Sequence, residues 1–302
     1  MKKIYFLLSL LIAGLTSCEK EETITTYTLT TQINGSGSVS VQQMNVMAGD
    51  TIVITATPDQ GKYFNGWTGD TTSYENPVSI VMNSDKNLTA NFVDETEIIQ
   101  LADNGVTLYC LPIAETGKKY PYNGEMYEIV DSARLYYLAY YGHDVTKVIT
   151  TNITNMNSLF KDRNFFNQDI STWDVSNVTD MELMFYRATY FNKDISNWDV
   201  SKVTNMGSMF HWAQNFNQDI SKWDVSNVTD MSVMFGRAEA FNQNISGWNV
   251  SKVTDMFTMF GYAVKFNQNL SSWDVDQVSL CLLFATYTPS WTLPKPRLSC
   301  TQ

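Results

Sequence analysis

Apolar and polar positions alternate in a pattern that repeats every 25 residues between residues 151 and 285. One unit reads FNQDISKWDVSNVTDMSVMFGRAEA and begins at Phe216. The most regular apolar positions are a phenylalanine row and a tryptophan row, at Phe166, Phe191, Phe216, Phe241 and Phe266, and at Trp173, Trp198, Trp223, Trp248 and Trp273. A unit this short cannot enclose its own apolar side chains, whereas stacked copies can. The pattern therefore predicts a solenoid of five repeats.

Within the unit that begins at Phe166, apolar residues are spaced two to four positions apart. This spacing fits neither one long helix nor one long strand, but it suits short segments that turn about a buried axis. We expect a short parallel strand at Trp173–Val175 or at Val178–Met181, and then a helical turn over Glu182–Ala188. The expected fold class is an α+β repeat solenoid with one short strand and one helical turn in each coil.

Residues 26–93 have a different pattern, in which β-branched and aromatic residues alternate with polar ones. Turn residues separate segments that read TYTLTTQI, SVSVQQM, TIVITATP, YFNGWTG, VSIVMNS and LTANFV. These segments predict a small antiparallel β module of four to six strands. We interpret Trp67 and Tyr63 as core residues of this module, with ligand binding as the alternative.

Residues 97–150 and 286–302 flank the repeats and are expected to cap them, because a terminal coil would otherwise expose its apolar side. Asp131 has the side chain of a helix N-cap and Gly142 is a typical helix terminator, so the segment between them predicts one helix. Short strands are expected around Gly105–Cys110 and Met126–Val130.

The N-terminus has the pattern of an export signal. Two lysines precede an apolar stretch too short to span a bilayer as a helix, and Leu15–Cys18 matches the lipobox of bacterial lipoproteins. We therefore expect a signal peptide over residues 1–17 and lipidation of Cys18, which begins a linker over residues 18–25. An ordinary secretory signal and an uncleaved anchor are the alternatives. Lys20–Glu22 resembles a surface-export signal of lipoproteins in the Bacteroidota, which favours the cell surface over the periplasmic face of the outer membrane.

Charge and hydropathy restrict the possible partners. The formal net charge is −11 and the pI is near 4.6, which argues against nucleic acid, because binding to phosphates needs a cationic surface. No second apolar run approaches the ~20 residues that a membrane-spanning helix needs. The lipid on Cys18 is therefore expected to be the membrane attachment.

Three cysteines remain after Cys18, and three thiols cannot all pair within one chain. Cys281 closes the last repeat and Cys300 lies in the tail, so a disulfide between them would fix the C-terminus. Export would permit such a bond. The spacing does not exclude Cys110 as a partner for either.

Polar residues also recur at the repeat period. The asparagine row is expected to cap backbone groups at a turn and to pass hydrogen bonds to the next coil, and an acidic row is expected to form a similar ladder. These rows are Asn167, Asn192, Asn217, Asn242 and Asn267, and Asp174, Asp199, Asp224, Asn249 and Asp274. Stacked carboxylates suggest calcium as an alternative. A neighbouring acidic row changes to Asn244 and Asn269 in the last two repeats, so we expect no metal and no other cofactor.

If the repeated positions are scaffold, function is expected where the repeats differ. The variable residues follow each Met-Phe or Leu-Phe pair, and they place Arg187, Trp212, Arg237 and Tyr262 at the repeat interval. Arginine, tryptophan and tyrosine dominate binding hot spots, and aromatic rings with neighbouring donors also suit glycans. This ladder is the candidate ligand face. The alternative is an ordinary solvated surface on which a few aromatic residues lie.

Catalysis is not expected. The sequence has two histidines, His143 and His211, in different predicted elements. It contains no HExxH, GxSxG, P-loop or CxxC motif, and its carboxylates recur at the repeat period, which is typical of structural residues.

Two resemblances extend this interpretation. The β module, with GSGSV, AGDTIVITATPDQGKYFNGWTGD and NLTANF, resembles the divergent B-repeat of internalin-type surface proteins, which usually acts as a spacer. The repeats resemble BspA-like leucine-rich-repeat surface proteins, in the branch with FNQDISxWDVSxVTxMxxMF units first described in mycoplasma surface lipoproteins.

The second resemblance runs from about Asn104 to the C-terminus and includes NGVTLYC and VTKVITTNITNM. It implies a leucine-rich-repeat-like solenoid and a role in adhesion or in contact with a host or partner. Related proteins often carry a second cysteine near Ile149, which this chain lacks, so the bridge that the resemblance would give Cys110 is in doubt.

We therefore expect a lipid-anchored, non-enzymatic protein at the cell surface, an outer-membrane lipoprotein. The β module would lift the solenoid off the membrane, and the solenoid would contact a surface protein or glycan. One alternative is a structural envelope component or spacer without a specific ligand. Another is an accessory protein that holds polysaccharide for a hydrolase.

Overall fold

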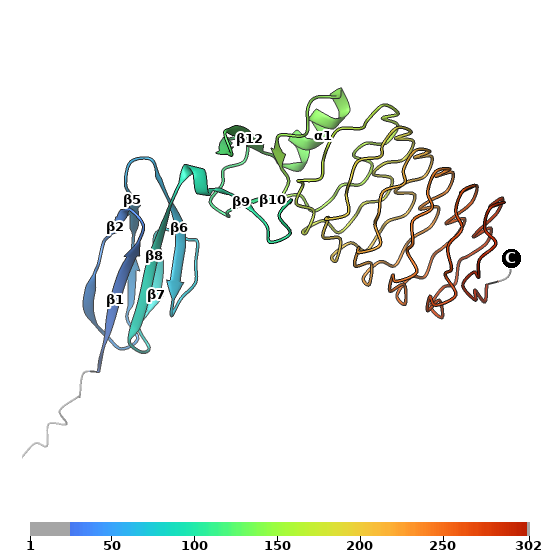
Figure 1. Cartoon of the computed structure of the whole chain (residues 1–302). Coiled ribbons are helices and arrows are strands. Elements are labelled where there is room, and N and C mark those ends of the chain that lie inside the picture. Colours follow the sequence, from blue (N-terminus) through green and yellow to red (C-terminus); the bar gives the residue numbers. More distant parts are fainter. Residues whose placement is uncertain (1–24, 301–302) are drawn as a thin grey trace, which may run out of the picture.

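The computed structural model describes residues 25–300, in which a β module is followed by a segment with a short helix and then by a stack of coils (Figure 1). The predicted signal peptide, lipidated Cys18 and surface-export signal lie outside the described residues. Among residues 25–300, no helix is both long enough and apolar enough to cross a bilayer.

The β module is a small two-layered structure. Its strands are β1 (Thr26–Asn34), β2 (Gly37–Val39), β3 (Gln43–Met47), β4 (Thr51–Ile54), β5 (Ala56–Pro58), β6 (Lys62–Gly69), β7 (Val78–Val81) and β8 (Lys86–Asp94). A four-stranded sheet in the order β3-β1-β8-β6 accompanies two pairs, β2–β5 and β4–β7. Leu29, Ile80 and Leu88 from these different sheets join one buried cluster, and Trp67 is also buried in it, as its core interpretation predicts.

The purely antiparallel module expected from the sequence is wrong in one pairing. β1 and β8 run parallel, with Leu29 opposite Lys86, although they are the first and last strands of the module. The module also has more strands than expected, because the SVSVQQM and TIVITATP segments are each divided between two sheets. Alternation predicts which residues face the core, but it does not reveal where a strand leaves one sheet and joins another.

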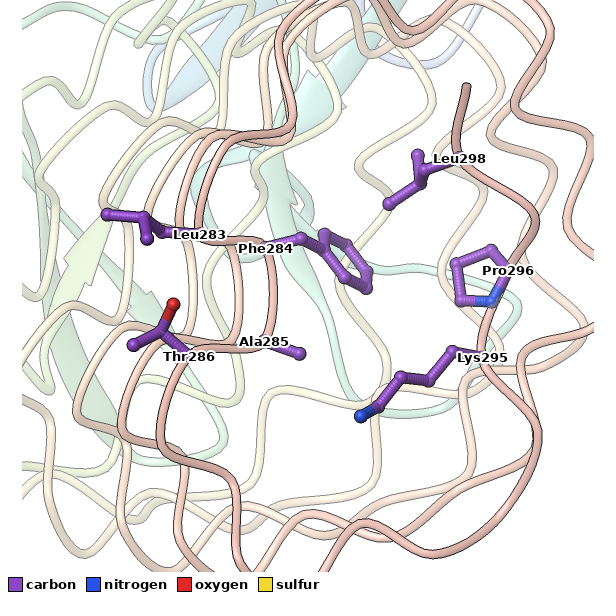
Figure 2. A pocket seen from close by; sticks show the side chains of 7 residues that line it. All are labelled: Leu283, Phe284, Ala285, Thr286, Lys295, Pro296 and Leu298. Carbon is purple, nitrogen blue, oxygen red and sulfur yellow. The ribbon is translucent and has the colours of Figure 1, made fainter. Parts of the chain in front are cut away.

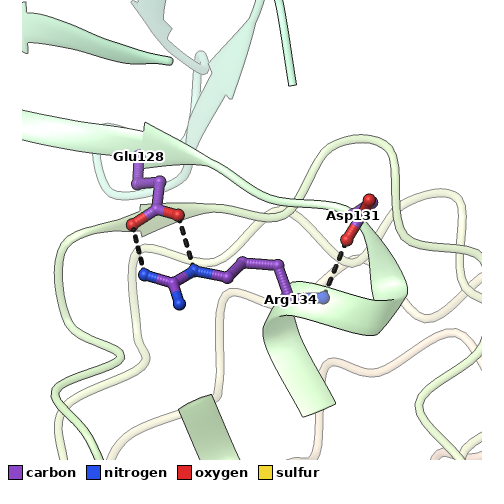
Figure 3. A network of polar contacts seen from close by, with 3 residues as sticks. All are labelled: Glu128, Asp131 and Arg134. Carbon is purple, nitrogen blue, oxygen red and sulfur yellow. Dashed lines mark hydrogen bonds and ion pairs between the residues drawn. The ribbon is translucent and has the colours of Figure 1, made fainter. Parts of the chain in front are cut away.

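The segment between the module and the coils contains η1 (Glu95–Glu97), β9 (Ile99–Leu101), β10 (Leu108–Cys110), β11 (Lys119–Tyr122), β12 (Glu125–Ile129), α1 (Ser132–Tyr141) and β13 (Val148–Ile149). The helix begins where the Asp131 carboxylate accepts a hydrogen bond of 2.7 Å from the Arg134 backbone N–H (Figure 3). It ends at Gly142, whose φ of 69° favours glycine. The predicted helix is therefore confirmed.

This segment makes contacts at both of its ends. The Tyr120 ring meets the Tyr63 ring of the β module edge-on, with centroids 6.2 Å apart. On the other side, Leu135 and Leu138 of α1 join the same buried cluster as the coils. The Tyr136 hydroxyl donates a 2.5 Å hydrogen bond to the Asn157 carbonyl of the first coil. The helix therefore covers the first coil with apolar side chains and satisfies one of its carbonyl groups.

The coils contain neither a long strand nor a helix. Consecutive coils are joined by isolated parallel β-bridges that link Asn155, Asp180, Asn205, Asp230, Asp255 and Leu280 in order. The expected strand thus falls in the Val178–Met181 alternative, but it is reduced to a single bridged residue. The expected helical turn over Glu182–Ala188 is wrong, because this segment is a series of turns.

Two backbone conformations explain the missing helical turn. Leu183 and Arg187 have φ values of 57° and 56°, in the left-handed region that interrupts a right-handed helix. The chain therefore directs alternate N–H groups toward the next coil. Leu183 donates to Gly207 O of that coil at 2.9 Å, whereas Met184 donates to Met181 O of its own coil at 3.2 Å. Periodicity alone does not distinguish this arrangement from a helical turn.

Aromatic rings fill the axis of the stack. Within one coil, the Phe185 and Phe191 rings stack at 4.0 Å, and Phe185 also lies parallel to Phe210 of the next coil at 5.5 Å. In the coils, the indole N–H of each tryptophan of the row donates to a backbone carbonyl about one repeat earlier in the chain, as where Trp198 Nε1 donates to Ile170 O at 3.2 Å. The periodic apolar residues thus form one continuous core, as their spacing predicts.

The C-terminal tail closes the last coil. Trp291 follows the phenylalanine row and meets Phe266 edge-on at 4.7 Å. A disulfide joins Cys281 to Cys300, with Cα atoms 5.9 Å apart. A groove remains between the tail and the last coil, lined by Leu283, Phe284, Ala285, Thr286, Lys295, Pro296 and Leu298 (Figure 2). Among the described cysteines, Cys110 is free and buried, and burial raises the pKa of its thiol.

Candidate functional site

The asparagine row has the structural role expected for it. The side-chain oxygen of Asn167 accepts from the backbone N–H of Asn192 at 3.0 Å, and the same contact recurs along the row to Asn267. Asn267 in turn accepts from Thr292 N at 2.9 Å in the tail. These side chains hold one coil to the next and are engaged in the scaffold.

The acidic row that begins at Asp174 does not form the expected ladder. Asp174 Oδ1 accepts from the Ser176 N–H of its own coil at 3.0 Å, and Asp199 accepts in the same way from Ser201. These are local turns rather than links between coils. Among residues 25–300, no three or more histidine, cysteine or acidic side chains are grouped so that they could hold a metal ion.

The candidate ligand residues lie at one turn of each coil, which we call the variable corner. It comprises residues 161–165, 186–190, 211–215, 236–240, 261–265 and 286–290. The second residue of each segment has φ between 55° and 64°. In the first five segments its N–H donates to the following coil, as Arg187 does to His211 O at 2.8 Å. The backbone is therefore held firmly while the side chain projects from a sharp turn.

The structure brings the four predicted residues into one row. Arg237 lies between two rings, with its Cζ 4.3 Å from the centre of the Trp212 ring and 4.2 Å from that of Tyr262. Guanidinium groups favour such positions because ring faces carry negative charge. Arg237 therefore covers one face of each of these two rings.

The row is longer than the sequence argument proposed. At the N-terminal end of the row, Asp162 forms an ion pair of 3.4 Å with Arg187. At the C-terminal end, the centre of the Tyr287 ring lies 5.3 Å from that of the Tyr262 ring. Both missed residues stand one repeat interval outside the predicted set. Counting the interval into the two flanking units would have found them.

His211 lies beside this row and is partly buried. Burial, followed by the positive charges of Arg237 and Arg187, lowers its pKa from the ordinary 6.5 to about 4. His211 is therefore neutral near pH 7. Its ring meets the Tyr186 ring edge-on at 5.2 Å, so it supports the row by packing and adds no charge.

The first coils carry a second aromatic group within the variable corner. The Phe165 and Tyr190 rings stack at 5.6 Å, and Phe165 remains 85% exposed. A groove beside them is lined by Ala139 and Gly142 near the end of α1 and by the residues from Asp162 to Gln168. The Arg163 guanidinium lies 4.6 Å from the centre of the Tyr140 ring and connects this region to α1.

Comparison with known protein families confirms both resemblances, that of the β module and that of the repeats. Residues 27–96 match the divergent InlB B-repeat domain. Residues 125–221 and 191–286 match a family described as Mycoplasma protein of unknown function, DUF285. No curated protein and no solved structure matches the chain. Because its two matches together cover more than half of the residues, the chain belongs to the DUF285 family.

Proposed function

We propose that this protein is a lipid-anchored, non-enzymatic binding protein of the cell surface, and that its variable corner contacts a protein or glycan partner. The observation that carries the proposal is the composition of this corner. All three arginines of the repeats, Arg163, Arg187 and Arg237, lie on it, although the chain as a whole has a net charge of −11. Most aromatic residues of the repeats that lie outside the core rows also occur here.

The match of Leu15–Cys18 to a lipobox supports the proposed lipid anchor. The β module would act as a spacer, as in the surface proteins that it resembles. The coils, each with one parallel bridge, support a leucine-rich-repeat-like solenoid as the architecture that presents the corner.

The binding proposal is tested by replacing Arg187, Trp212, Arg237 and Tyr262 together by serine in cells that display the protein. Adherence to the partner surface is expected to fall to background, with the surface level unchanged. The matched control replaces Lys202 and Lys252, which lie on another side of the coils, each bonded at 2.7 Å to an asparagine of the preceding coil. Unchanged adherence in the fourfold variant would favour a spacer without a ligand.

The anchor has its own test. Fatty-acid labelling of the wild type is expected to be lost in Cys18→Ala. A labelled Cys18→Ala protein would overturn the lipid anchor while leaving the binding proposal open to its separate test.

A further inference from the structure

The variable corner differs in charge from the rest of the chain. Its cations outnumber its carboxylates, with Lys161, Arg163, Arg187, Arg237 and Lys265 against Asp162 and Glu239. Both carboxylates have partners, because Asp162 pairs with Arg187 and Glu239 accepts from the Gln214 amide at 2.9 Å. A positive strip on an acidic protein favours an anionic ligand there.

Arg237 is the residue of this strip whose side chain is most clearly positioned by its neighbours. Its guanidinium group lies between the Trp212 and Tyr262 rings, and the residue is half-buried. No acceptor among residues 25–300 receives a hydrogen bond from its side chain. A guanidinium that is stacked on both faces retains its in-plane donors, which match the two oxygens of a carboxylate or sulfate.

Another arginine of this chain shows what a satisfied guanidinium looks like. Arg134 donates from Nε to Glu128 Oε1 at 2.7 Å and from Nη2 to Glu128 Oε2 at 3.2 Å (Figure 3). Arg237 has the donors for the same two-pronged contact, but its carboxylate would have to come from outside the described residues. The stacking rings would hold the donors in position before the ligand arrives.

The backbone of the corner does not favour a peptide that adds as a strand. Asp162, Trp212 and Tyr262 each donate their N–H to the following coil, at 2.8–2.9 Å. Strand addition needs unpaired backbone groups, so recognition at this surface depends on side chains. Phe165, 85% exposed and stacked on Tyr190, offers an open ring face on which a sugar ring can lie.

We propose that the variable corner binds a linear acidic polysaccharide, with Arg237 holding a carboxylate or sulfate group and Phe165 stacking against a sugar ring. This inference rests on the proposed function and names the ligand class of the same surface. The stacked geometry of Arg237, its unpaired donors and the open ring of Phe165 support it together.

The test is calorimetric titration of the purified full chain with polygalacturonate, dextran sulfate, neutral dextran and polyglutamate. Polygalacturonate or dextran sulfate is expected to bind, which also separates carboxylate from sulfate as the recognised group. Arg237→Gln is expected to weaken this binding about tenfold, because it removes one charge-assisted, two-pronged contact. Arg237→Lys keeps the charge but not the fork, so a smaller loss is expected.

Lys252→Gln is the matched control, because it removes the same charge from another side of the coils. Thermal unfolding of each variant verifies that the stack is intact. Phe165→Ala is a second probe on a mostly exposed side chain, and it is expected to weaken polysaccharide binding several-fold without lowering the unfolding temperature.

Equal weakening by Arg237→Gln and Lys252→Gln would overturn the proposal, since it would indicate diffuse charge attraction only. Tighter binding of polyglutamate than of either acidic polysaccharide would also overturn it, and would assign the corner to an acidic protein. If the wild type binds no polysaccharide while the fourfold serine variant loses adherence, this inference fails and the proposed binding function stands.

Discussion

The β module and the stack of coils form their cores in different ways. In the module, β1 pairs with β8, so residues such as Leu29 and Lys86 that are far apart in sequence lie side by side. In the stack, contacts join residues of the same coil, such as Phe185 and Phe191, or residues about one repeat apart, such as Phe185 and Phe210. Every position in the module therefore has its own side-chain environment, whereas the environment of a position in the stack recurs once in every coil.

The same difference affects the left-handed turns. Those of the module are glycines, and at Gly69 an added Cβ would lie 2.3 Å from the Asn87 carbonyl oxygen. Those of the coils are larger residues, including Arg187 and Trp212. The coil turns face outward, so they accept side chains that the interior of the module would exclude. Close-packed turns at Gly35, Gly66 and Gly69 fix the module, and open turns give the stack a surface that can vary.

The largest expected effect comes from opening the ring stack. Phe210→Ala removes a fully buried ring that lies between Phe185 and Phe235, at 5.5 and 5.8 Å, and is expected to cost about 3–5 kcal/mol. Urea unfolding followed by hydrogen exchange would show the loss in the coils, with the β module unchanged. Equal loss of protection in both regions would mean that they unfold as one unit.

The disulfide tests whether the tail supports only its neighbouring coil. Cys281→Ser with Cys300→Ser removes a cross-link over a sequence separation of 19 residues and is expected to cost about 3 kcal/mol. Proteolysis should then begin at the last coil. Cleavage that starts in the β module of this variant would contradict the nearest-neighbour character of the stack.

A glycine substitution in the β module tests whether its close-packed turn requires glycine. Gly69→Ala places a Cβ against Asn87 O at a φ of 109° and is expected to destabilise the module by about 2 kcal/mol. Gly247→Ala in the coils is the control, because no atom lies within 4 Å of its added Cβ. Similar unfolding temperatures for the two variants would show that the close approach to Asn87 O does not require glycine at position 69.

The smallest effect concerns pH. Because the folded chain lowers the pKa of His211 to about 4, the unfolded chain takes up the proton more readily. This contribution to stability is complete above about pH 6.5 and is lost as the pH falls to about 4. Allowing for partial exposure, it amounts to about 1–2 kcal/mol.

His211→Asn is expected to remove this part of the pH dependence, measured as the free energy of unfolding between pH 4 and 7. His143→Asn, at an exposed position after α1, is the control and should leave it in place. An unchanged slope in His211→Asn would show that other groups cause the pH dependence.

Much of the stack followed from the sequence because the same side-chain environment is sampled in every repeat. Phe185, Trp198 and Met209 are buried as their period predicts, and the asparagine row forms its predicted links. The helical turn was mistaken because Leu183 and Arg187 adopt left-handed conformations that apolar spacing does not encode. The parallel β1–β8 pair was missed because alternation carries no information on strand direction.

The candidate site was predictable in part for the same reason. The repeat interval aligned Trp212, Arg237 and Tyr262 without any coordinates. The interval could not indicate that Arg237 lies between the two rings, because side-chain direction depends on the local backbone. That contact is what distinguishes a positioned guanidinium from a solvated one.

The hydrogen bonds between coils give the stack a direction and make its middle modular. Each interior coil receives from one neighbour the same contacts that it gives to the other, while α1 and Trp291 serve only the two ends. A gene duplication that inserted one whole unit would therefore leave both ends fitting as before. Lineages could lengthen or shorten the display surface by recombination, one step at a time, without first evolving a new fold.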